Sequence, residues 1–410
     1  MVIEKGNAMQ EGTMPTIWVG IDAGKWKHHV VLLDAEGKTL LSQTVKNDET
    51  ALLELLSSVI ALAAGAPLRW AIDLNSGGSA LLVALLAAHE QELVYIPGRI
   101  IHHAAATYRG DGKTDAKDAR IIADQARIRS DLRPPKERDQ ASVDLHLLTA
   151  RRLDLVHDRV RTINRLRATL LEYFPALEAS FDYSKRQAAL LLLTKYATPQ
   201  TLRRAGKARL TRWLQARECR TAGQVADKAL AAAAAQATQL PTQTVAAELV
   251  AELANDVLRL DSDISRVDSQ IKARLQDTTS GALLQSMPGF GPVLAAAFIA
   301  RTGSDLTEFE SPDHLASAAG LAPVPRDSGR ITGNNHRPKR FDRILLRTCY
   351  LAAHSSLKNS PASRAYYHRK RSEGKSHKQA LIALARRRLN VIWAMLRDQT
   401  PFQEPAANAA

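Results

Sequence analysis

An apolar seam in the middle of the chain constrains its fold most strongly. Apolar residues recur at steps of three and four between Thr244 and about Leu275, at Ala246, Leu249, Leu253, Val257, Leu260, Ile264, Val267 and Ile271. A repeat of about 3.5 residues is typical of a coiled-coil helix, which needs a second helix against its seam. Another long helix is predicted from Val143 to about Phe174. The seam therefore pairs with that helix or with another copy of the chain, and the sequence leaves both open.

The residues before the long helices favour an α/β domain. Three strand-like runs, TIWVGIDAG, HHVVLLDAEG and KTLLSQTV, lie between residues 16 and 45, and a turn at Ala35, Glu36 and Gly37 predicts an antiparallel meander. A helix (48–64), the strand LRWAIDL, a helix after Gly77-Gly78, the strand LVYIP and helical sequence through DGKTDAKDAR (111–120) follow. Strands first and α/β alternation afterwards match a ribonuclease H-like layout.

Four carboxylates in this domain are candidate metal ligands. Asp22 lies within an apolar strand and Asp73 at the end of a later one, where an ionised side chain needs a cation or hydrogen-bond donors. Asp115 and Asp118 are three residues apart, which on a helix places two like charges on one face. Carboxylates suit Mg²⁺ or Mn²⁺, and a pair of such ions assists phosphodiester chemistry.

Each acid also has a structural interpretation. Asp115 after Thr114 would begin a helix, and Asp118 would lie in its first turn, where the helix dipole favours acids. In the metal-site interpretation the flanking Lys113 and Lys117 face solvent or nucleic acid. The neighbouring pair His102 and His103 is interpreted as structural and is left out of the site.

The positive charge is concentrated near the carboxyl end. From Leu321 to Thr400 there are 18 Lys and Arg against 4 Asp and Glu, whereas the rest of the chain holds 38 of each. A field of this strength predicts a polyanionic partner, because neutralised phosphates release counterions. A solvated basic face and a membrane surface are the weaker alternatives.

Cysteine content and hydropathy argue against a disulfide-rich, a zinc-binding or a membrane protein. Cys219 and Cys349 stand far apart, so neither a disulfide framework nor a structural zinc site is indicated. No signal peptide and no apolar run of membrane length are recognisable, so we expect a cytoplasmic protein with no membrane partner.

Three shorter segments organise the second half of the chain. ALAAAAAQATQLPTQ (229–243) is expected to be a spacer. SMPGFGPV (286–293) resembles the turn of helix-hairpin-helix modules, and either phosphate contact or tight packing explains its glycines. GLAPVPRDSGRITGNNHRPKR (320–340) is expected to be a loop before further helices.

At this point the chain resembles a known family, the insertion-sequence transposases with an N-terminal RuvC-like DEDD domain and a C-terminal serine-bearing transposase domain, which act as recombinases guided by a bridge RNA. The resemblance covers residues 16–400. It rests on GIDAGK, GDGKTDAKDA, MPGFGPVLAA and GLAPVPRDSGR, in that order.

The resemblance implies a division of the chain. A tail (1–15) precedes a RuvC-like domain (16–135), a helical coiled-coil region (136–280), a mainly helical serine-bearing domain (281–400) and a second tail (401–410). Asp22, Asp115 and Asp118 match the first, third and fourth acids of the family's tetrad. The second is usually Glu, and Asp73 stands in its place.

The resemblance also implies a mechanism. Ser328 in RDSGR matches the family's nucleophile, which attacks a DNA phosphodiester and forms a phosphoserine link with the help of Mg²⁺ or Mn²⁺. No nucleotide cofactor is needed. The partners are donor and target DNA and a structured guide RNA, around which homodimers join into a tetramer.

The same interpretation makes the basic residues near Ser328 candidates for phosphate contacts. They are Arg326, Arg330, His336, Arg337, Lys339, Arg340, Arg343 and Arg347. Arg386, Arg387 and Arg388 form a later cluster, of which a part is expected to be solvated or paired with carboxylates.

Two other functions remain open. The first is a metal-only nuclease of the Holliday-junction-resolving type, which uses the four acids with water as the nucleophile. The second is a non-catalytic nucleic-acid scaffold, in which the acids are scattered.

Overall fold

The computed structural model describes residues 15–404 except 75–76, 109–111, 113, 135–138, 308 and 337. It divides the chain into two compact units, Met1–Glu137 and Arg138–Ala410. Within the described residues, no helix is both long enough and apolar enough to span a membrane.

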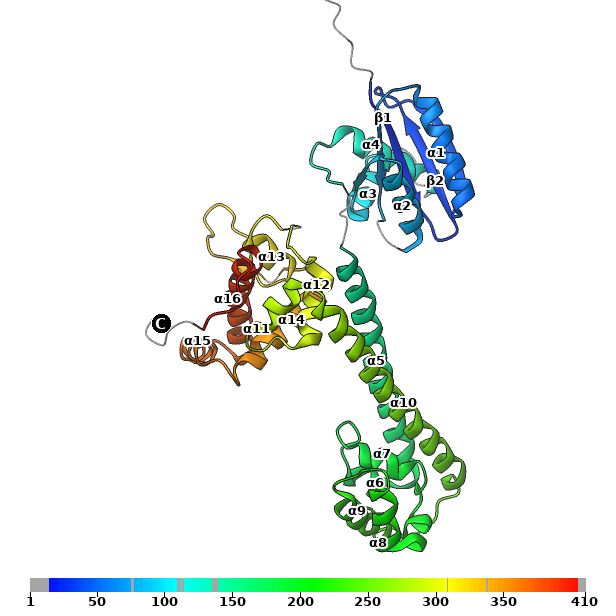
Figure 1. The fold of residues 1–410 in the computed structure, drawn as a ribbon, viewed down its shortest axis with the longest axis vertical. Coiled ribbons are helices and arrows are strands. Elements are labelled where there is room, and N and C mark those ends of the chain that lie inside the picture. Colours follow the sequence, from blue (N-terminus) through cyan, green and yellow to red (C-terminus); the bar gives the residue numbers. More distant parts are fainter. Residues whose placement is uncertain are drawn as a thin grey trace, which may run out of the picture. The chain divides into compact units, whose positions relative to one another are not determined.

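The first unit is a five-stranded mixed sheet with helices on both faces (Figure 1). Its elements are β1 (Ile17–Ala23), β2 (Lys27–Leu33), β3 (Thr39–Lys46), α1 (Glu49–Ala63), β4 (Leu68–Ile72), the 3₁₀ helix η1 (Gly77–Ser79), α2 (Ala80–Ala88), β5 (Glu92–Tyr95), α3 (Gly98–Ala105) and α4 (Asp115–Ile128). The strand order is β3-β2-β1-β4-β5. β1, β2 and β3 are antiparallel neighbours, whereas β4 and β5 run parallel to β1. The predicted meander is confirmed.

Alternation along the strands assigns each face of this sheet to different helices. Val19 and Ile21 of β1 pack in one core with buried leucines of α1 and α2. Ala71 of β4 packs on the opposite face with Ile121 and Ile122 of α4 and with Ile101 of α3. Trp18 of β1 also lies on the α4 side. The side chains at even positions of β1 therefore face α4.

The prediction of helical sequence through residues 111–120 is confirmed from Asp115 onward, whereas Gly112 and Thr114 are not helical. α3 ends at Ala105, and α4 begins only at Asp115, with Thr114 as its N-cap. The Thr114 hydroxyl accepts a hydrogen bond from the backbone N–H of Lys117, at 3.2 Å. A capping threonine satisfies an N–H that has no partner within the helix, so the chain starts a new helix there.

The second unit is helical apart from one short hairpin within its described residues. Its elements are α5 (Gln140–Tyr173), α6 (Pro175–Ser180), α7 (Gln187–Leu193), α8 (Pro199–Gln215), α9 (Ala222–Ala234), α10 (Gln243–Gln276), α11 (Thr279–Ser286), α12 (Pro292–Thr302), α13 (Pro312–Ala318), β6 (Val324–Pro325), β7 (Asn335–His336), α14 (Arg343–Ser356), α15 (Pro361–Ser372) and α16 (His377–Arg397).

The two long helices pack antiparallel against each other within the chain (Figure 1). The Nε atom of Arg152 on α5 lies 2.5 Å from the Asp268 carboxylate on α10. Seven residues further along α5, Arg159 pairs with Asp261, which lies seven residues earlier on α10. This heptad-spaced ladder fixes the register, so the intramolecular alternative for the seam is the one observed.

The predicted seam is wrong at Leu249, although Ala246 before it is buried as expected. Val257, Val267 and Ile271 are buried as expected, but Leu249 is 47% exposed. Val250 and Ala254 are buried instead. In this part α10 packs against the core formed by α5 to α9, and so the buried stripe changes to the side that faces those helices.

The spacer prediction for residues 229–243 is also wrong in its first part. Ala229, Ala232 and Ala233 belong to α9 and lie buried in the core shared by α5 to α10. Alanine has a high helix propensity, and its small side chain permits close helix packing. An alanine-rich run therefore forms a packed helix here, and only the residues after Ala235 leave it.

A second core joins the carboxyl-terminal helices to one end of the coiled coil. Leu145 of α5 and Leu275 of α10 pack in it with buried residues of α11, α12, α14 and α16. Pro401–Glu404 continue along this core: Phe402 packs against it, and the Glu404 carboxylate accepts a hydrogen bond from Ser360 at 2.8 Å.

Candidate functional site

The sheet register brings the first two candidate acids together. β1 and β4 are parallel neighbours with Ile21 opposite Ile72, so Asp22 and Asp73 follow at adjacent carboxyl ends of the two strands. By strand alternation both side chains belong to the face covered by α4. Both residues are half-buried.

Gly20 allows α4 to lie directly on the sheet at this point. A Cβ atom at Gly20 would lie 2.1 Å from the Ala119 carbonyl oxygen and 2.3 Å from the Ala123 nitrogen. Only glycine permits such close backbone contact. The first turn of α4, which carries Asp118, therefore lies beside the strand end that carries Asp22.

Three of the four acids line one cavity of about 420 Å³. Asp22, Asp73 and Asp118 contribute from β1, the end of β4 and α4. The other lining residues are Gly98, Ile101, His102, Ala105, Ala106, Tyr108, Gly112 and Lys117. Lys117, expected to face solvent or nucleic acid, is therefore part of the cavity wall, and so is His102, which the sequence interpretation left out.

Asp115 is not among the residues that line this cavity. Its side chain is 60% exposed, and its Oδ2 atom lies 3.5 Å from Lys27 Nζ. Asp115 occupies the first position of α4, where its charge also favours the helix dipole. Its position agrees with the helix-start interpretation. Lys113 lies outside the described residues.

The donor set of the cavity suits a hard cation. Three carboxylates from separate elements provide the oxygen ligands that Mg²⁺ and Mn²⁺ prefer. Among the described residues, however, no three His, Cys, Asp or Glu side chains are close enough to hold an ion as they stand. The chemistry of these carboxylates fits a divalent metal, but in this structure the three side chains line the cavity without being close enough together to bind one ion.

The sequence pattern did not reveal a hydrogen-bonded network that begins at Tyr108 in the cavity wall. The Tyr108 hydroxyl donates to Asp124 Oδ2 at 2.5 Å, and Arg127 donates to Asp124 Oδ1 at 2.7 Å. Burial and the hydrogen bond to Asp124 raise the pKa of Tyr108 above its usual value. Tyr108 therefore stays protonated and acts as a donor. Its pairing depends on the packing of α4 against residues 106–108, which has no sequence signal.

Ser328 lies at the exposed tip of a short β-hairpin. β6 and β7 pair antiparallel, and Ser328 exchanges two backbone hydrogen bonds with Ile331, at 3.1 and 2.9 Å. Gly329 has a positive φ of 49°, as a tight turn requires. The Asp327 carboxylate accepts a hydrogen bond from the Asn334 N–H at 2.9 Å. The expected loop is therefore a hairpin that holds the serine on a turn.

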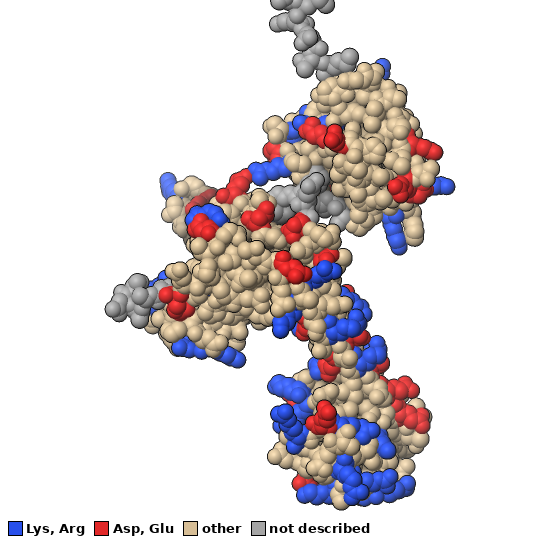
Figure 2. All heavy atoms as spheres, in the orientation of Figure 1, with Lys and Arg blue, Asp and Glu red and all other residues tan. Residues whose placement is uncertain are grey.

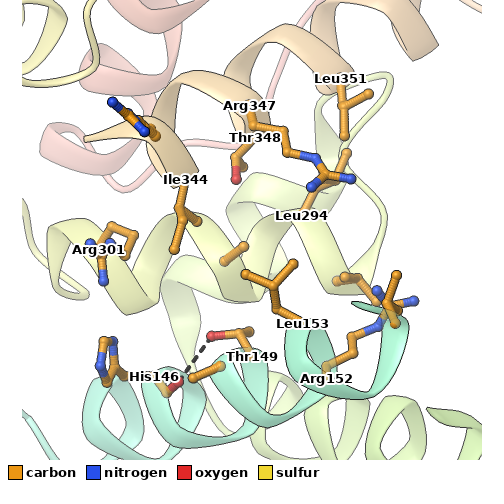
Figure 3. Close-up of a pocket in the computed structure, with 15 residues that line it drawn as sticks. His146, Thr149, Arg152, Leu153, Leu294, Arg301, Ile344, Arg347, Thr348 and Leu351 are labelled. Carbon is orange, nitrogen blue, oxygen red and sulfur yellow. Dashed lines mark hydrogen bonds between the residues drawn. The ribbon is translucent and has the colours of Figure 1, made fainter. Parts of the chain in front are cut away.

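The basic residues proposed for phosphate contact lie at the surface wherever the structure describes them. Arg326, Arg330, His336, Lys339, Arg340, Arg343 and Arg347 are all exposed, whereas Arg337 lies outside the described residues. Arg343 and Arg347 border a pocket of about 300 Å³ between α5, α12 and α14 (Figure 3). Leu153, Leu294 and Ile344 give this pocket apolar walls.

The later arginine cluster is largely structural. Arg386 pairs with Asp313, as expected for a carboxylate partner, and the guanidinium of Arg387 lies 4.9 Å from the ring centroid of Tyr366. Arg388 is buried and donates to the Pro288 carbonyl. Burial lowers the pKa of Arg388 to about 10.

Tight packing explains the first glycine of the 286–293 turn. A Cβ atom at Gly289 would lie 2.2 Å from the Ala352 carbonyl oxygen, and its φ of 91° favours glycine as well. Gly291 is the N-cap of α12, and a Cβ atom added there would meet nothing within 4 Å among the described residues. Phosphate contact at this turn therefore stays a prediction that concerns Gly291 alone.

A second basic surface was hidden by the overall charge balance. Residues 199–220 hold seven Lys and Arg against one acidic residue, and Figure 2 shows Lys and Arg gathered over the lobe of α6 to α9. Arg217 stacks on Trp213, with its guanidinium 3.9 Å from the ring centroid. Acids elsewhere, many on α10, cancel this local excess, so that the residues outside Leu321–Thr400 sum to zero.

Comparison with known proteins gives matches over both units. Residues 19–175 match a family model described as a transposase (DEDD, IS110), and residues 281–368 match one described as transposase IS116/IS110/IS902 family. The chain is 54% identical over 394 residues to the 42 kDa protein of insertion element IS900 from Mycobacterium paratuberculosis, which covers 96% of this chain and 99% of that protein.

Two further relatives extend the similarity. The 44.8 kDa protein of insertion element IS116 from Streptomyces clavuligerus is 49% identical over 386 residues, 94% of this chain and 96% of that protein. A pilin gene-inverting protein from Moraxella bovis is 31% identical over 157 residues, 37% of this chain and 48% of that protein.

Proposed function

Because the chain belongs to the IS116/IS110/IS902 transposase family, we propose that it cuts and rejoins DNA through a covalent link between Ser328 and a DNA phosphate. The observation that carries this proposal is that the chain contains two features. One is the cavity lined by Asp22, Asp73 and Asp118. The other is the exposed Ser328, which lies on a turn between the exposed Arg326 and Arg330.

The sheet supports a ribonuclease H-like, RuvC-like first unit. An antiparallel β1–β2–β3 meander followed by two parallel strands, in the order β3-β2-β1-β4-β5, is compatible with that fold. In this arrangement the strand ends that carry Asp22 and Asp73 and the first turn of α4 lie on one face of the sheet.

Asp22, Asp73 and Asp118 are the residues that would hold Mg²⁺ or Mn²⁺. Such a cation activates an attacking oxygen or stabilises a leaving one in phosphodiester chemistry. Asp115 is the fourth acid of the proposal, and its carboxylate already pairs with the Lys27 ammonium. We therefore assign Asp115 a weaker role than Asp118.

The serine step conserves the energy of the phosphodiester. The Ser328 Oγ atom forms a bond to phosphorus, the bond from phosphorus to one nucleoside oxygen breaks, and that oxygen gains a proton as the serine loses its own. A hydroxyl of the new partner strand then attacks the phosphoserine and restores the serine. Arg326 and Arg330 stabilise the negative charge that develops on the phosphoryl oxygens.

The proposed partners follow from the family and from charge. They are donor and target DNA and a structured guide RNA, which supplies sequence choice by base pairing. The chain acts in the bacterial cytoplasm as a homodimer that assembles into a tetramer. The exposed basic residues from Arg326 to Arg347 contact nucleic-acid phosphates.

The test is a trapped covalent adduct. The full-length protein is incubated with its element-end DNA, its guide RNA and Mg²⁺, and a protein–DNA adduct that resists denaturation is measured. We expect Ser328→Ala to abolish the adduct and Ser355→Ala, at an exposed serine on α14, to retain it. Asp118→Asn is expected to reduce adduct formation far more than Asp115→Asn. DNA cleavage that survives Ser328→Ala would remove the serine mechanism.

That outcome would instead favour a metal-only nuclease. The observation in favour of this second function is that the three cavity acids all belong to the first unit, which contains no part of the serine hairpin. Water would then be the nucleophile, and Asp118→Asn would still abolish cleavage.

A further inference from the structure

Trp26 is an exposed indole close to the acid cavity. It lies in the turn between β1 and β2, and 77% of its surface is exposed. No other large hydrophobic side chain of the described residues is as exposed. An indole exposed to this degree offers a large, flat aromatic face to a binding partner.

The backbone that carries this indole is held in place on both sides. The Asn47 N–H donates to the Trp26 carbonyl at 3.0 Å. The Asn47 side-chain amide donates to the carbonyls of Lys25, at 3.1 Å, and Gly78, at 2.7 Å. A Cβ atom at Gly78 would lie 2.8 Å from the Gly24 carbonyl oxygen, so the turn packs tightly on the start of η1. The fold thus fixes the turn while its largest side chain points into solvent.

Positive charges flank the indole and connect it to the acid site. Lys25 Nζ lies 4.6 Å from the Trp26 ring centroid. Lys27 Nζ reaches Asp115 at the first position of α4. Trp26 is four residues after Asp22, so their Cα atoms are at most about 14 Å apart. A strand advances about 3.4 Å per nucleotide, so this reach corresponds to a few nucleotides.

We propose that Trp26 stacks on an unpaired base of the DNA strand whose phosphodiester lies at the acid cavity, while Lys25 contacts a neighbouring phosphate. The proposal rests on the proposed function for the position of that strand. Aromatic side chains stack on any base because every base has a π face, and adjacent cations follow the backbone. The positive charge of Lys25 beside the ring favours a polyanion over an apolar protein segment as the occupant.

The experiment measures binding without chemistry. Full-length protein carrying Ser328→Ala is titrated with a fluorescently labelled oligodeoxyadenylate, and with oligoriboadenylate in parallel. Trp26→Ala is expected to weaken DNA binding roughly 5- to 150-fold, which corresponds to the loss of one stacked base. Trp26→Phe keeps an aromatic face and is expected to stay within about threefold of the parent.

The matched control is Trp213→Phe, at a half-buried indole that already contacts Tyr196 and Arg217. It should bind DNA as the parent does. Quenching of intrinsic tryptophan fluorescence on DNA binding should disappear in Trp26→Phe and persist in Trp213→Phe. Lys25→Ala should reduce the slope of log K against log salt by about 0.7, whereas Trp26→Ala should leave it unchanged.

Equal DNA affinity of Trp26→Ala and the parent would overturn the proposal, and so would a dependence on Trp26 seen only with RNA. The serine mechanism is tested separately by the adduct, so its failure would leave the binding result standing. A circular dichroism melt checks folding, and no loss is expected because the indole is exposed.

Discussion

Substitution of Gly20 by alanine is expected to separate α4 from the sheet and thereby disable the acid site. The added Cβ atom would lie 2.1 Å from the Ala119 carbonyl oxygen, whereas ordinary contact begins at 3.4 Å. The difference is about 1.3 Å, and the atoms in the way are backbone atoms that no side-chain rotation can remove. The helix must therefore move as a whole.

The magnitude follows from this displacement. Overpacking a well-packed site costs about 1–3 kcal/mol, and we expect the upper end because the contact is with backbone. At about 4 °C per kcal/mol in a domain of this size, the melting temperature of the first unit should fall by about 10 °C. Metal ligands tolerate shifts of only about 0.2 Å, and a misplacement of 1 Å costs about 100-fold in rate.

Two measurements check this expectation. Thermal unfolding gives the loss of stability, and the adduct assay, run well below the melting temperature, gives the loss of activity. The control is Gly223→Ala on α9, where an added methyl group would meet no described atom outside its own helix within 4 Å, and the helix favours alanine. It should not lower the melting temperature. If Gly20→Ala melts within about 1 °C of the wild type and forms the adduct at an undiminished rate, the close packing of α4 does not position the acids.

Three further predictions concern stability. Burial lowers the pKa of His28, so the unfolded chain binds its proton at a higher pH than the folded one. Unfolding free energy should therefore fall as pH drops below 6.5, by at most about 1.4 kcal/mol per pH unit for this group, and urea titrations at pH 7.5 and 5.0 should show a weaker fall in His28→Phe. Arg388→Met should cost about 2–4 kcal/mol, because the Pro288 carbonyl loses its buried donor, while Arg387→Met at the exposed neighbour should cost less than about 1 kcal/mol; equal losses in chemical denaturation would contradict this assignment. Ile271→Ala should lower the unfolding free energy by about 2–5 kcal/mol and Leu249→Ala by under about 1 kcal/mol, since the first side chain is buried and the second is 47% exposed. A larger loss in Leu249→Ala in the same assay would mean that Leu249 belongs to the buried seam.

The sequence by itself determined the elements that depend on local pattern. Period-two runs gave the β1–β2–β3 meander, with Gly37 at a positive φ in its turn, and the repeat of three and four gave the long helix α10. Periodicity reports which face of a segment is apolar and needs no knowledge of the partner. The same holds for Asp22 and Asp73, because a carboxylate at the end of an apolar strand is conspicuous wherever that strand lies.

Only the tertiary structure decided what those faces meet. The partner of α10, the exposure of Leu249 and the packing of Ala229, Ala232 and Ala233 depend on helices far away in the chain. The cavity likewise depends on the register of β1 with β4 and on the contact of α4 at Gly20, which separate Asp118 from Asp115 although both start the same helix. The sequence pattern shows whether a residue is apolar or charged. It does not show which residues surround that side chain in the fold, because those residues lie far away in the chain.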